Sequence, residues 1–234
     1  MRLFEDGFEL GDFSLWDGVS ASSGGEAAVV EGLAFRGKRS GKFAVPGVAT
    51  IESASSRKQL ANLREVYARC YVNVAQTGIV NNDARVFFIQ FRSATSTVAW
   101  AGWRKTGGVI KWHLLIRDGI GYAGAYSDAV PMLNRWYCVE LYWKEDAAAG
   151  IGRLYVDGQL VCEIINKNTA NYGDCNQVNF GITEANGCTA PSEVYEDQCA
   201  IAQEYIGPEG IQVPLFPLIL IGSLIVLALS KRGG

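Results

Sequence analysis

The polar side chains within four short apolar segments are the residues best suited to act on a ligand. Alternate residues of a β-strand face opposite sides, so side chains that alternate with an apolar set share the other face. In 136–144 the apolar set is Tyr137, Val139, Leu141 and Trp143. The same division of 66–73, 85–92 and 111–117 predicts these outward candidates for ligand binding: Arg69, Tyr71, Gln90, Arg92, His113, Glu140 and Tyr142.

These side-chain types suit carbohydrate. Guanidinium and amide groups form fork-like hydrogen bonds with sugar hydroxyls and carboxylates, while aromatic faces cover C–H patches. The alternative is a solvated outer face on an ordinary sandwich. A nucleophilic triad is poorly supported, because His113 is the one histidine available as a base.

Metal chemistry has weak support in the sequence. The oxygen ligands of Asn81-Asn82-Asp83, or of Asp12 with Asp17, could bind calcium, although neither run has the dense carboxylate spacing of a recognised loop. The six cysteines form no C-x-x-C pair, which disfavours zinc. Disulfides in an oxidising compartment are expected, with buried free thiols as the alternative.

Net charge argues against nucleic acid as a partner. The formal charge is −3, and no basic run of the kind that follows phosphates is present. The composition, 49% hydrophobic and 19% charged, is that of a folded domain, and 27 glycines favour many turns.

The elements that must position these side chains are short strands. About a dozen apolar segments are separated by glycine and polar clusters, and Asp157-Gly158 is a strong two-residue hairpin signal. Only 57–64 suggests a short helix. We therefore predict an all-β, antiparallel, two-sheet jelly-roll sandwich over residues 1–206.

The C-terminal region has a different character. After a predicted linker at 207–212, residues 213–229 carry no charge, and Lys231 and Arg232 follow. We predict one transmembrane helix over 213–230 and a basic tail over 231–234, with the C-terminus cytoplasmic and the domain outside. No signal peptide precedes Met1-Arg2-Leu3, so either a leader has been removed or the protein is tail-anchored.

Several segments together resemble the concanavalin A-like (laminin G-like) lectin/glucanase superfamily. They are the opening 4–16, the strand 65–72, the tryptophan strand 136–141, the Leu154–Gly158 hairpin and the closing 196–208. The resemblance implies a curved sheet, and if the four candidate strands share it, their outward residues form one concave site. The proline-rich entry, apolar stretch and terminal basic pair also resemble archaeal surface-protein sorting tails, with Pro214-Leu215-Phe216 as the nearest match to their signature.

The enzymes of this family carry motifs that the sequence matches only in part. Its hydrolases carry a Glu-x-Asp-x-x-Glu run that has no match here. Its lyases use arginine, glutamine, histidine and tyrosine, with the glutamine and histidine two residues apart. Here Gln90 is followed by Arg92 at the histidine's place. No catalytic residue is assigned, and the expectation is that the protein is not an enzyme and needs no cofactor.

The resemblance also suggests a disulfide. It places strand 65–75 beside the closing strand, where Cys70 and Cys199 would both face the core. Cys175 and Cys188 flank one predicted strand and its following loop, and Cys138 with Cys162 remain by elimination.

Three functions stay open on the sequence. The first is a membrane-anchored surface module, extracellular or on a virion, that binds a glycan or a protein partner through the concave sheet. The second is a structural protein of a cell-surface layer or virion that self-associates through its jelly roll. The third is a polysaccharide lyase.

Overall fold

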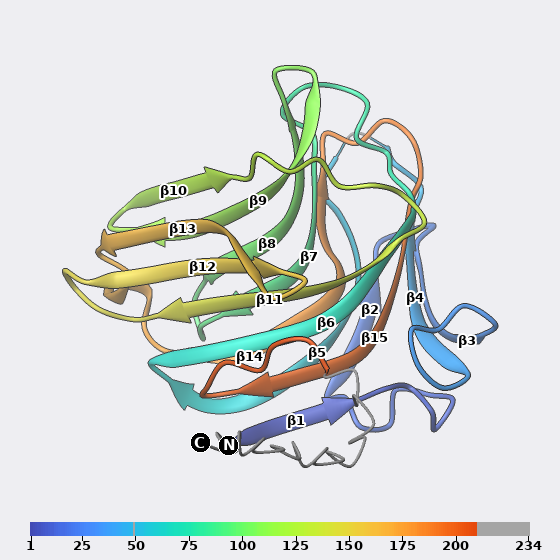
Figure 1. The fold of residues 1–234 in the computed structure, drawn as a ribbon, viewed down its shortest axis with the longest axis horizontal. Helices are drawn as coiled ribbons and strands as arrows, with labels where there is room; N and C mark the ends of the chain where they lie inside the picture. The colour runs from blue at the N-terminus through green and yellow to red at the C-terminus, as the bar shows by residue number, and fades with distance from the viewer. Residues whose placement is uncertain (49, 210–234) are drawn as a thin grey trace, which may run out of the picture.

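The fold is a sandwich of two antiparallel sheets (Figure 1). The structure, a computed structural model, describes residues 1–48 and 50–209. Sheet A has the order β13 (Gln159–Lys167), β12 (Gly150–Val156), β11 (Trp136–Lys144), β6 (Glu65–Gln76), β15 (Ser192–Ala202), β4 (Arg39–Val45) and β3 (Glu26–Glu31), with β1 (Arg2–Asp6) also paired to β15. Sheet B has the order β10 (Gly121–Tyr126), β9 (Val109–Asp118), β8 (Thr97–Thr106), β7 (Arg85–Arg92), β14 (Cys175–Asn186), β5 (Glu52–Leu63) and β2 (Gly18–Ala21).

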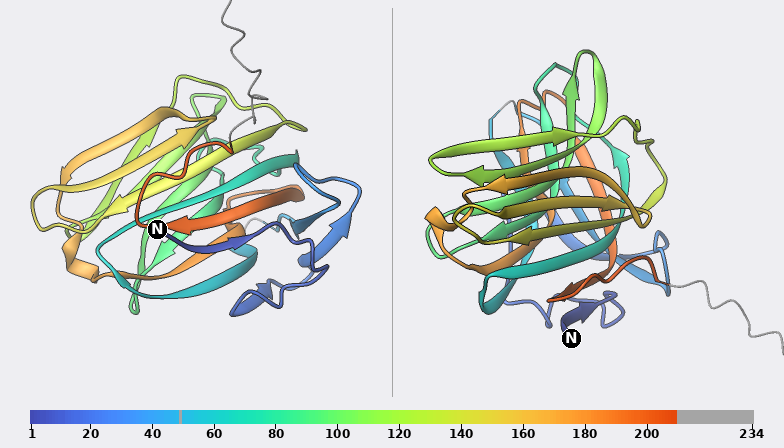
Figure 2. Two further views of the ribbon diagram at one scale, coloured as in Figure 1. Left: turned by 60° about the horizontal axis from the view of Figure 1, so that its bottom comes forward. Right: turned by 60° about the vertical axis from the view of Figure 1, so that its left-hand side comes forward.

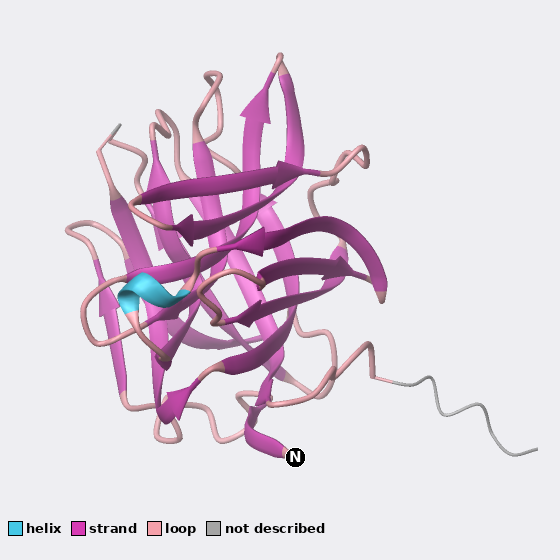
Figure 3. Ribbon diagram, turned by 90° about the vertical axis from the view of Figure 1, so that its left-hand side faces the viewer, coloured by secondary structure: helices cyan, strands magenta, loops and turns pink. Residues whose placement is uncertain are grey.

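The described residues contain a single helical turn, the 3₁₀ helix η1 (Ala170–Tyr172), shown in cyan in Figure 3. The two-sheet jelly-roll prediction is therefore confirmed. The suggested helix at 57–64 is wrong, because residues 57–63 belong to β5 and pair along β14, and Arg57 also lies opposite Gly18 of β2. Pairing with a distant strand overrides a local preference that only resembled a helix.

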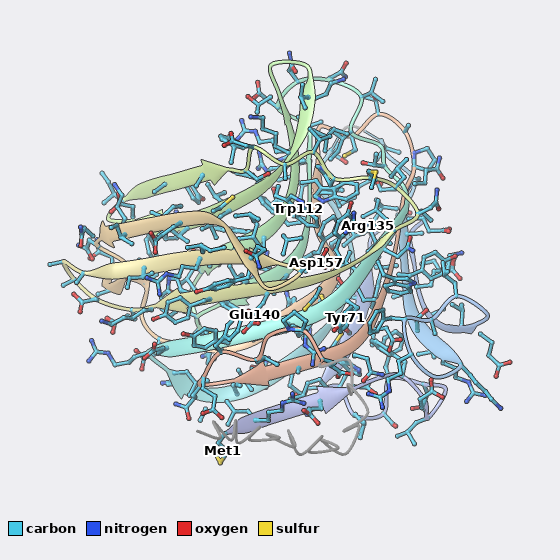
Figure 4. All side chains as sticks on the ribbon, in the orientation of Figure 1. Met1, Tyr71, Trp112, Arg135, Glu140 and Asp157 are labelled. Carbon is cyan, nitrogen blue, oxygen red and sulfur yellow. The ribbon has the colours of Figure 1, made fainter. Side chains whose placement is uncertain are left out.

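The core fills the space between the sheets. Trp103 and Trp112 pack edge to face with their ring centroids 5.6 Å apart, and Trp143 is also fully buried. Trp112 is labelled in Figure 4, between the two layers. Burying aromatic side chains of this size provides much of the hydrophobic stabilisation of a sandwich.

The predicted hairpin between β12 and β13 is confirmed. Asp157 and Gly158 both have positive φ (50° and 79°), as a two-residue type I′ turn requires. The Asp157 carboxylate accepts the Cys138 N–H at 2.9 Å and the Arg135 Nη2–H at 3.1 Å, which ties the turn to β11.

The expected disulfides are not present: all six cysteines are free and buried. Cys70 and Cys199 both lie in the core, on the paired strands β6 and β15, but they are not bridged.

Geometry excludes the other two predicted pairs. Cys175 begins β14 and Cys188 lies beyond its end, so an extended strand of about 40 Å separates them. Cys162 faces the core, whereas Cys138 alternates with the core residues Tyr137 and Val139 and faces outward.

The predicted membrane segment lies outside the described residues. Within 1–48 and 50–209, no helix has the length and hydropathy needed to cross a bilayer. Residues 207–209, assigned to a linker from the sequence, contact the sandwich through hydrogen bonds to Glu140 and Tyr71.

Candidate functional site

The predicted site residues divide between the two sheets. Because the sheets pack through their inner faces, their outer faces point to opposite sides of the molecule, and the candidates do not form one site. Sheet A carries Arg69 and Tyr71 on β6 and Glu140 and Tyr142 on β11; sheet B carries Gln90 and Arg92 on β7 and His113 on β9.

The chain's own C-terminal segment covers the sheet A group. The Glu140 carboxylate accepts the N–H groups of Ile206 and Gly207, each at 2.8 Å, and the Tyr71 hydroxyl accepts the Glu209 N–H at 2.8 Å. The Glu209 carboxylate pairs with Arg69 Nη2 at 3.2 Å. Figure 4 labels Tyr71 and Glu140 on this face. Burial raises the pKa of Glu140, and the two backbone hydrogen bonds oppose that shift.

Tyr142 is also held by neighbours. Its hydroxyl donates to Glu65 Oε1 at 2.7 Å, and its ring stacks on Tyr67 with centroids 4.3 Å apart. Burial, followed by the Glu65 carboxylate, raises the pKa of Tyr142. The four sheet A candidates therefore bind parts of this chain in the described structure.

On sheet B, Gln90 belongs to a row of side-chain amides. Gln59 Nε2 donates to Gln177 Oε1 at 2.7 Å, Gln177 Nε2 to Asn179 Oδ1 at 2.7 Å, and Asn179 Nδ2 to Gln90 Oε1 at 2.8 Å. All three bonds run in one direction. Among the described residues nothing accepts a hydrogen bond from the Gln90 amino group, so the row ends in an unused donor on a side chain that is 6% exposed.

The row arises from the strand register. Asn179 on β14 lies opposite Gln90 on one side and Arg57 on the other, and Gln177 lies opposite Arg92 and Gln59. Val178 and Phe180 are fully buried between the sheets, so alternation turns Gln177 and Asn179 to the outer face. We call Gln59, Gln90, Gln177 and Asn179 the amide row.

Three arginines flank the amide row. Arg57, Arg92 and Arg117 are the arginines within 1–48 and 50–209 that form no ion pair with a described residue. Neutral groups position two of them: Arg92 donates to Thr97 Oγ1 at 3.1 Å, and the Arg117 guanidinium lies 4.3 Å from the Tyr122 ring centroid. The outer face of sheet B therefore carries three arginines without an ion pair, on a protein of net charge −3.

His113 lies near this surface but is enclosed. Its ring stacks between Phe87 and Tyr126, at 5.3 and 4.7 Å, and is fully buried. Neither ring nitrogen has a hydrogen-bond partner in the described structure. Burial, with the charges of Arg104 and Arg85, lowers the pKa of His113 to about 3. His113 is therefore a neutral residue that packs against aromatic rings.

Sequence reasoning did not select Arg57, Gln59, Gln177, Asn179 or Arg117. The first two fell in the segment interpreted as a helix. Alternation predicts that Arg117 faces outward. Whether it forms an ion pair depends on residues that are far from it in the sequence, so the pattern alone does not show it.

The proposed calcium ligands have other partners here. Asp83 pairs with Arg104 at 2.7 Å, and Asn82 Oδ1 accepts the Gly108 N–H at 2.9 Å. Asp17 accepts the Gln59 N–H at 2.8 Å. The described residues contain no group of three or more histidine, cysteine, aspartate or glutamate side chains placed to hold a metal ion. Calcium binding stays an untested prediction.

Comparison with known proteins shows the fold. No family model and no curated protein sequence matches this chain. Among solved structures, an endo-β-1,4-glucuronan lyase from Trichoderma reesei is similar with a TM-score of 0.67 and 17% identity over 87% of this chain and 96% of its own. Cellulose induced protein Cip1 has a TM-score of 0.63 and 17% identity over 88% of this chain and all of its own. A family 7 alginate lyase has a TM-score of 0.51 and 7% identity over 70% and 80% of the two chains. The shared feature is a jelly-roll sandwich.

These neighbours overturn one expectation. The prediction that the protein is not an enzyme is wrong as an interpretation of the sequence, because polysaccharide lyases have this same sandwich with chains of nearly this extent. The sandwich fold is therefore compatible with a lyase.

Proposed function

We propose that this protein binds an acidic polysaccharide on the outer face of sheet B and is tethered to a membrane by residues 213–230. The observation that carries the glycan assignment is the coincidence of three unpaired arginines with the amide row on one surface. The names of two similar structures, a glucuronan lyase and an alginate lyase, support acidic chains as the ligand class.

The chemistry of the surface matches a uronate polymer. A guanidinium binds a carboxylate through two parallel N–H···O bonds, and amides bind hydroxyl groups as donors and acceptors together. Strands β5, β14, β7, β8 and β9 are adjacent in that order, so the surface from Arg57 to Arg117 extends about 19 Å across the strands. That length would accommodate several consecutive sugar units.

Titration calorimetry with glucuronate and mannuronate oligomers tests the assignment. We expect Arg92→Ala and Gln90→Ala each to weaken binding by about 10- to 100-fold, because a charge-assisted hydrogen bond contributes roughly 1.5–3 kcal/mol. A neutral glucan oligomer of the same length should bind far more weakly. Added salt should reduce affinity for the acidic oligomers.

Arg153→Ala is the matched control. Arg153 also lies on an outer face, but on sheet A and paired with Glu163 at 2.7 Å. Its substitution should leave affinity unchanged. Unaltered affinity in both sheet B variants, or no binding of any acidic oligomer, would refute the proposal. Self-association of the unliganded protein in sedimentation experiments would instead favour the structural role.

A second candidate is β-elimination on the same polymer, favoured by Tyr122 beside Arg117. The Tyr122 side chain is 55% exposed and lies next to Trp100, at 5.8 Å between ring centroids. In such a reaction a base removes the proton α to the uronate carboxyl group, the electrons form a C=C bond, and the glycosidic C–O bond breaks as its oxygen takes a proton. Arginine or amide donors would stabilise the carboxylate, and Tyr122 is our candidate for proton transfer.

The ultraviolet absorbance of unsaturated product ends distinguishes binding from elimination. If the protein is a lyase, Tyr122→Phe should abolish product formation and leave oligomer affinity within about two-fold. Binding without product in the unaltered protein would reject elimination and retain the glycan assignment.

A further inference from the structure

The segment after the last strand returns over the outer face of sheet A. Figure 1 shows it at the red end of the colour scale, running back past β15, and Figure 2 shows β1 alongside β15 on the same side. Residues 205–209 form no strand, yet Gly207 is buried. We call residues 205–209 the clasp.

Three backbone N–H groups of the clasp donate to buried side-chain acceptors. Glu140, 1% exposed, accepts from Ile206 and Gly207, and Tyr71, 5% exposed, accepts from Glu209. A carboxylate that accepts two adjacent N–H groups forms charge-assisted bonds, which are stronger than neutral ones.

Side chains hold the end of the clasp from two directions. The Glu209 carboxylate contacts Arg69 at 3.2 Å and Arg36 at 3.0 Å. The loop that carries Arg36 is itself fixed to sheet A, because its backbone N–H donates to Asp197 Oδ2 at 2.8 Å. Beside it, the Phe35 ring stacks on Tyr71 with centroids 3.5 Å apart.

Aromatic and turn contacts hold the beginning of the clasp. The Tyr205 ring packs against Tyr155 at 5.0 Å and Tyr67 at 6.4 Å. Pro208 lies against the β12–β13 hairpin, close enough that a Cβ on Gly158 would be 3.2 Å from its ring. The contacts together involve β6, β11, β12 and the loop before β4.

The position of Glu209 limits the reach of the chain beyond it. Only residues 210–212 separate Glu209 from the uncharged stretch that begins at Val213. At most about 14 Å of extended chain can therefore lie between the clasp and that stretch. If residues 203–209 did not contact the sandwich, the free chain between the end of β15 and Val213 would be seven residues longer.

We propose that the clasp orients the domain on the membrane, with the outer face of sheet A toward the bilayer and the outer face of sheet B away from it. This inference rests on the membrane tether of the proposed function. It assigns Arg69, Tyr71 and Glu140 to holding the clasp, and it leaves the amide row and its arginines accessible to polymers in solution.

Energy transfer to a lipid-bound acceptor in phospholipid vesicles tests the orientation. A donor dye is attached to the full chain through Glu163→Cys, on the outer face of sheet A, or through Tyr122→Cys, on sheet B. The six native cysteines are all buried, so an introduced surface thiol reacts selectively in the folded protein. We expect clearly greater transfer from position 163 than from position 122.

A clasp variant provides the second arm. Tyr71→Phe with Glu209→Gln removes the Tyr71 acceptor and the Glu209 ion pairs but retains the chain length. The difference in transfer between positions 163 and 122 should then shrink. Amide hydrogen exchange at Ile206, Gly207 and Glu209 should accelerate by about ten-fold or more, while exchange in the β-core stays unchanged. Glu193→Gln, at a site away from the clasp, is the control.

The outcomes separate the two proposals. Equal transfer from the two positions in the unaltered chain, or greater transfer from position 122, overturns the orientation. Rapid exchange of all three clasp amides in the unaltered chain overturns the clasp itself. A chain that does not associate with vesicles refutes the tether and the orientation together, while the calorimetric test of glycan binding stands independently.

Discussion

Two buried ionisable residues, Glu196 and His113, are expected to make the stability of this sandwich depend on pH. Glu196 on β15 is fully buried, and neither carboxylate oxygen has a hydrogen-bond partner in the described structure. His113 is also fully buried without a partner. Burial raises the pKa of Glu196 well above its usual value and lowers that of His113 to about 3, so each residue is held in its neutral form.

Glu196→Gln should change how stability depends on pH. In the unaltered protein the unfolded state releases a proton that the folded state retains, so stability falls as pH rises above about 4.5. Glutamine removes this dependence, and the variant's advantage should grow by up to about 1.4 kcal/mol per pH unit. Urea unfolding at several pH values measures it. Glu193→Gln on the same strand is the control. If the stability of Glu196→Gln varies with pH in parallel with that of the unaltered protein, Glu196 is not held neutral in the fold.

His113→Phe should have the opposite pH dependence. The depressed pKa means that acid protonates the unfolded state first, so the histidine costs stability as pH falls below about 6.5. Relative to the unaltered protein, the phenylalanine variant should gain about 2 kcal/mol between pH 7.5 and pH 5. Chemical unfolding at these two pH values checks the difference. If the stability difference between the variant and the unaltered protein is the same at both pH values, His113 is solvated or charged in the fold.

At the scale of elements, β14 joins the candidate site to the core. It pairs with β5 and β7 and presents the amide row outward, while Val178 and Phe180 pack inward. Its register with β7 shifts between Phe180 and Glu184, so an irregularity interrupts the ladder beside the amide row. Gly181 lies at this point, with φ of 104°.

Gly181→Ala should destabilise the domain by about 2–4 kcal/mol, because strain at positive φ and core crowding act together. An added Cβ would lie 2.6 Å from the Phe43 ring and 2.7 Å from the Ala54 carbonyl oxygen. Gly32→Ala is the matched control, since φ there is 100° but no atom lies within 4 Å of the added Cβ. Thermal unfolding of both variants measures the crowding, and equal losses would show that Phe43 moves aside.

At the scale of the molecule, the two outer faces differ in the groups that they contact or present. Sheet A binds the chain's own residues 205–209, and sheet B presents positive charge and amides. The buried core residues all lie between Phe8 and Ile201. The stability of the sandwich therefore depends on residues that precede the uncharged C-terminal stretch.

Removal of residues 211–234 should yield a folded, soluble domain. The truncated chain retains the core and the whole clasp, so we expect a β-type circular dichroism spectrum and cooperative thermal unfolding. Size-exclusion chromatography measures its solubility and association state. Aggregation of the truncated chain would show that the removed residues cover part of the fold.

The sequence by itself determined the jelly-roll class, the Asp157-Gly158 hairpin and the core-facing side of β6, β9 and β11. These features depend on local rules, since side-chain alternation and turn conformation involve residues that are close in the chain. Val139 and Glu140, for example, lie on the predicted faces of β11. In β7 simple alternation places Phe87 in the core and Phe88 outward, and this is wrong, because a bulge between Phe87 and Ile89 turns Phe88 inward.

Only the tertiary structure decided which outward residues meet. Segments 66–73 and 136–144 pair with one another in sheet A, whereas 85–92 and 111–117 belong to sheet B. Alternation is identical in either sheet, so it cannot assign a strand to a partner. The pairing of Arg57 with Asn179, and of Glu140 with the clasp, joins residues more than sixty positions apart, and such contacts follow from the packing of the whole chain.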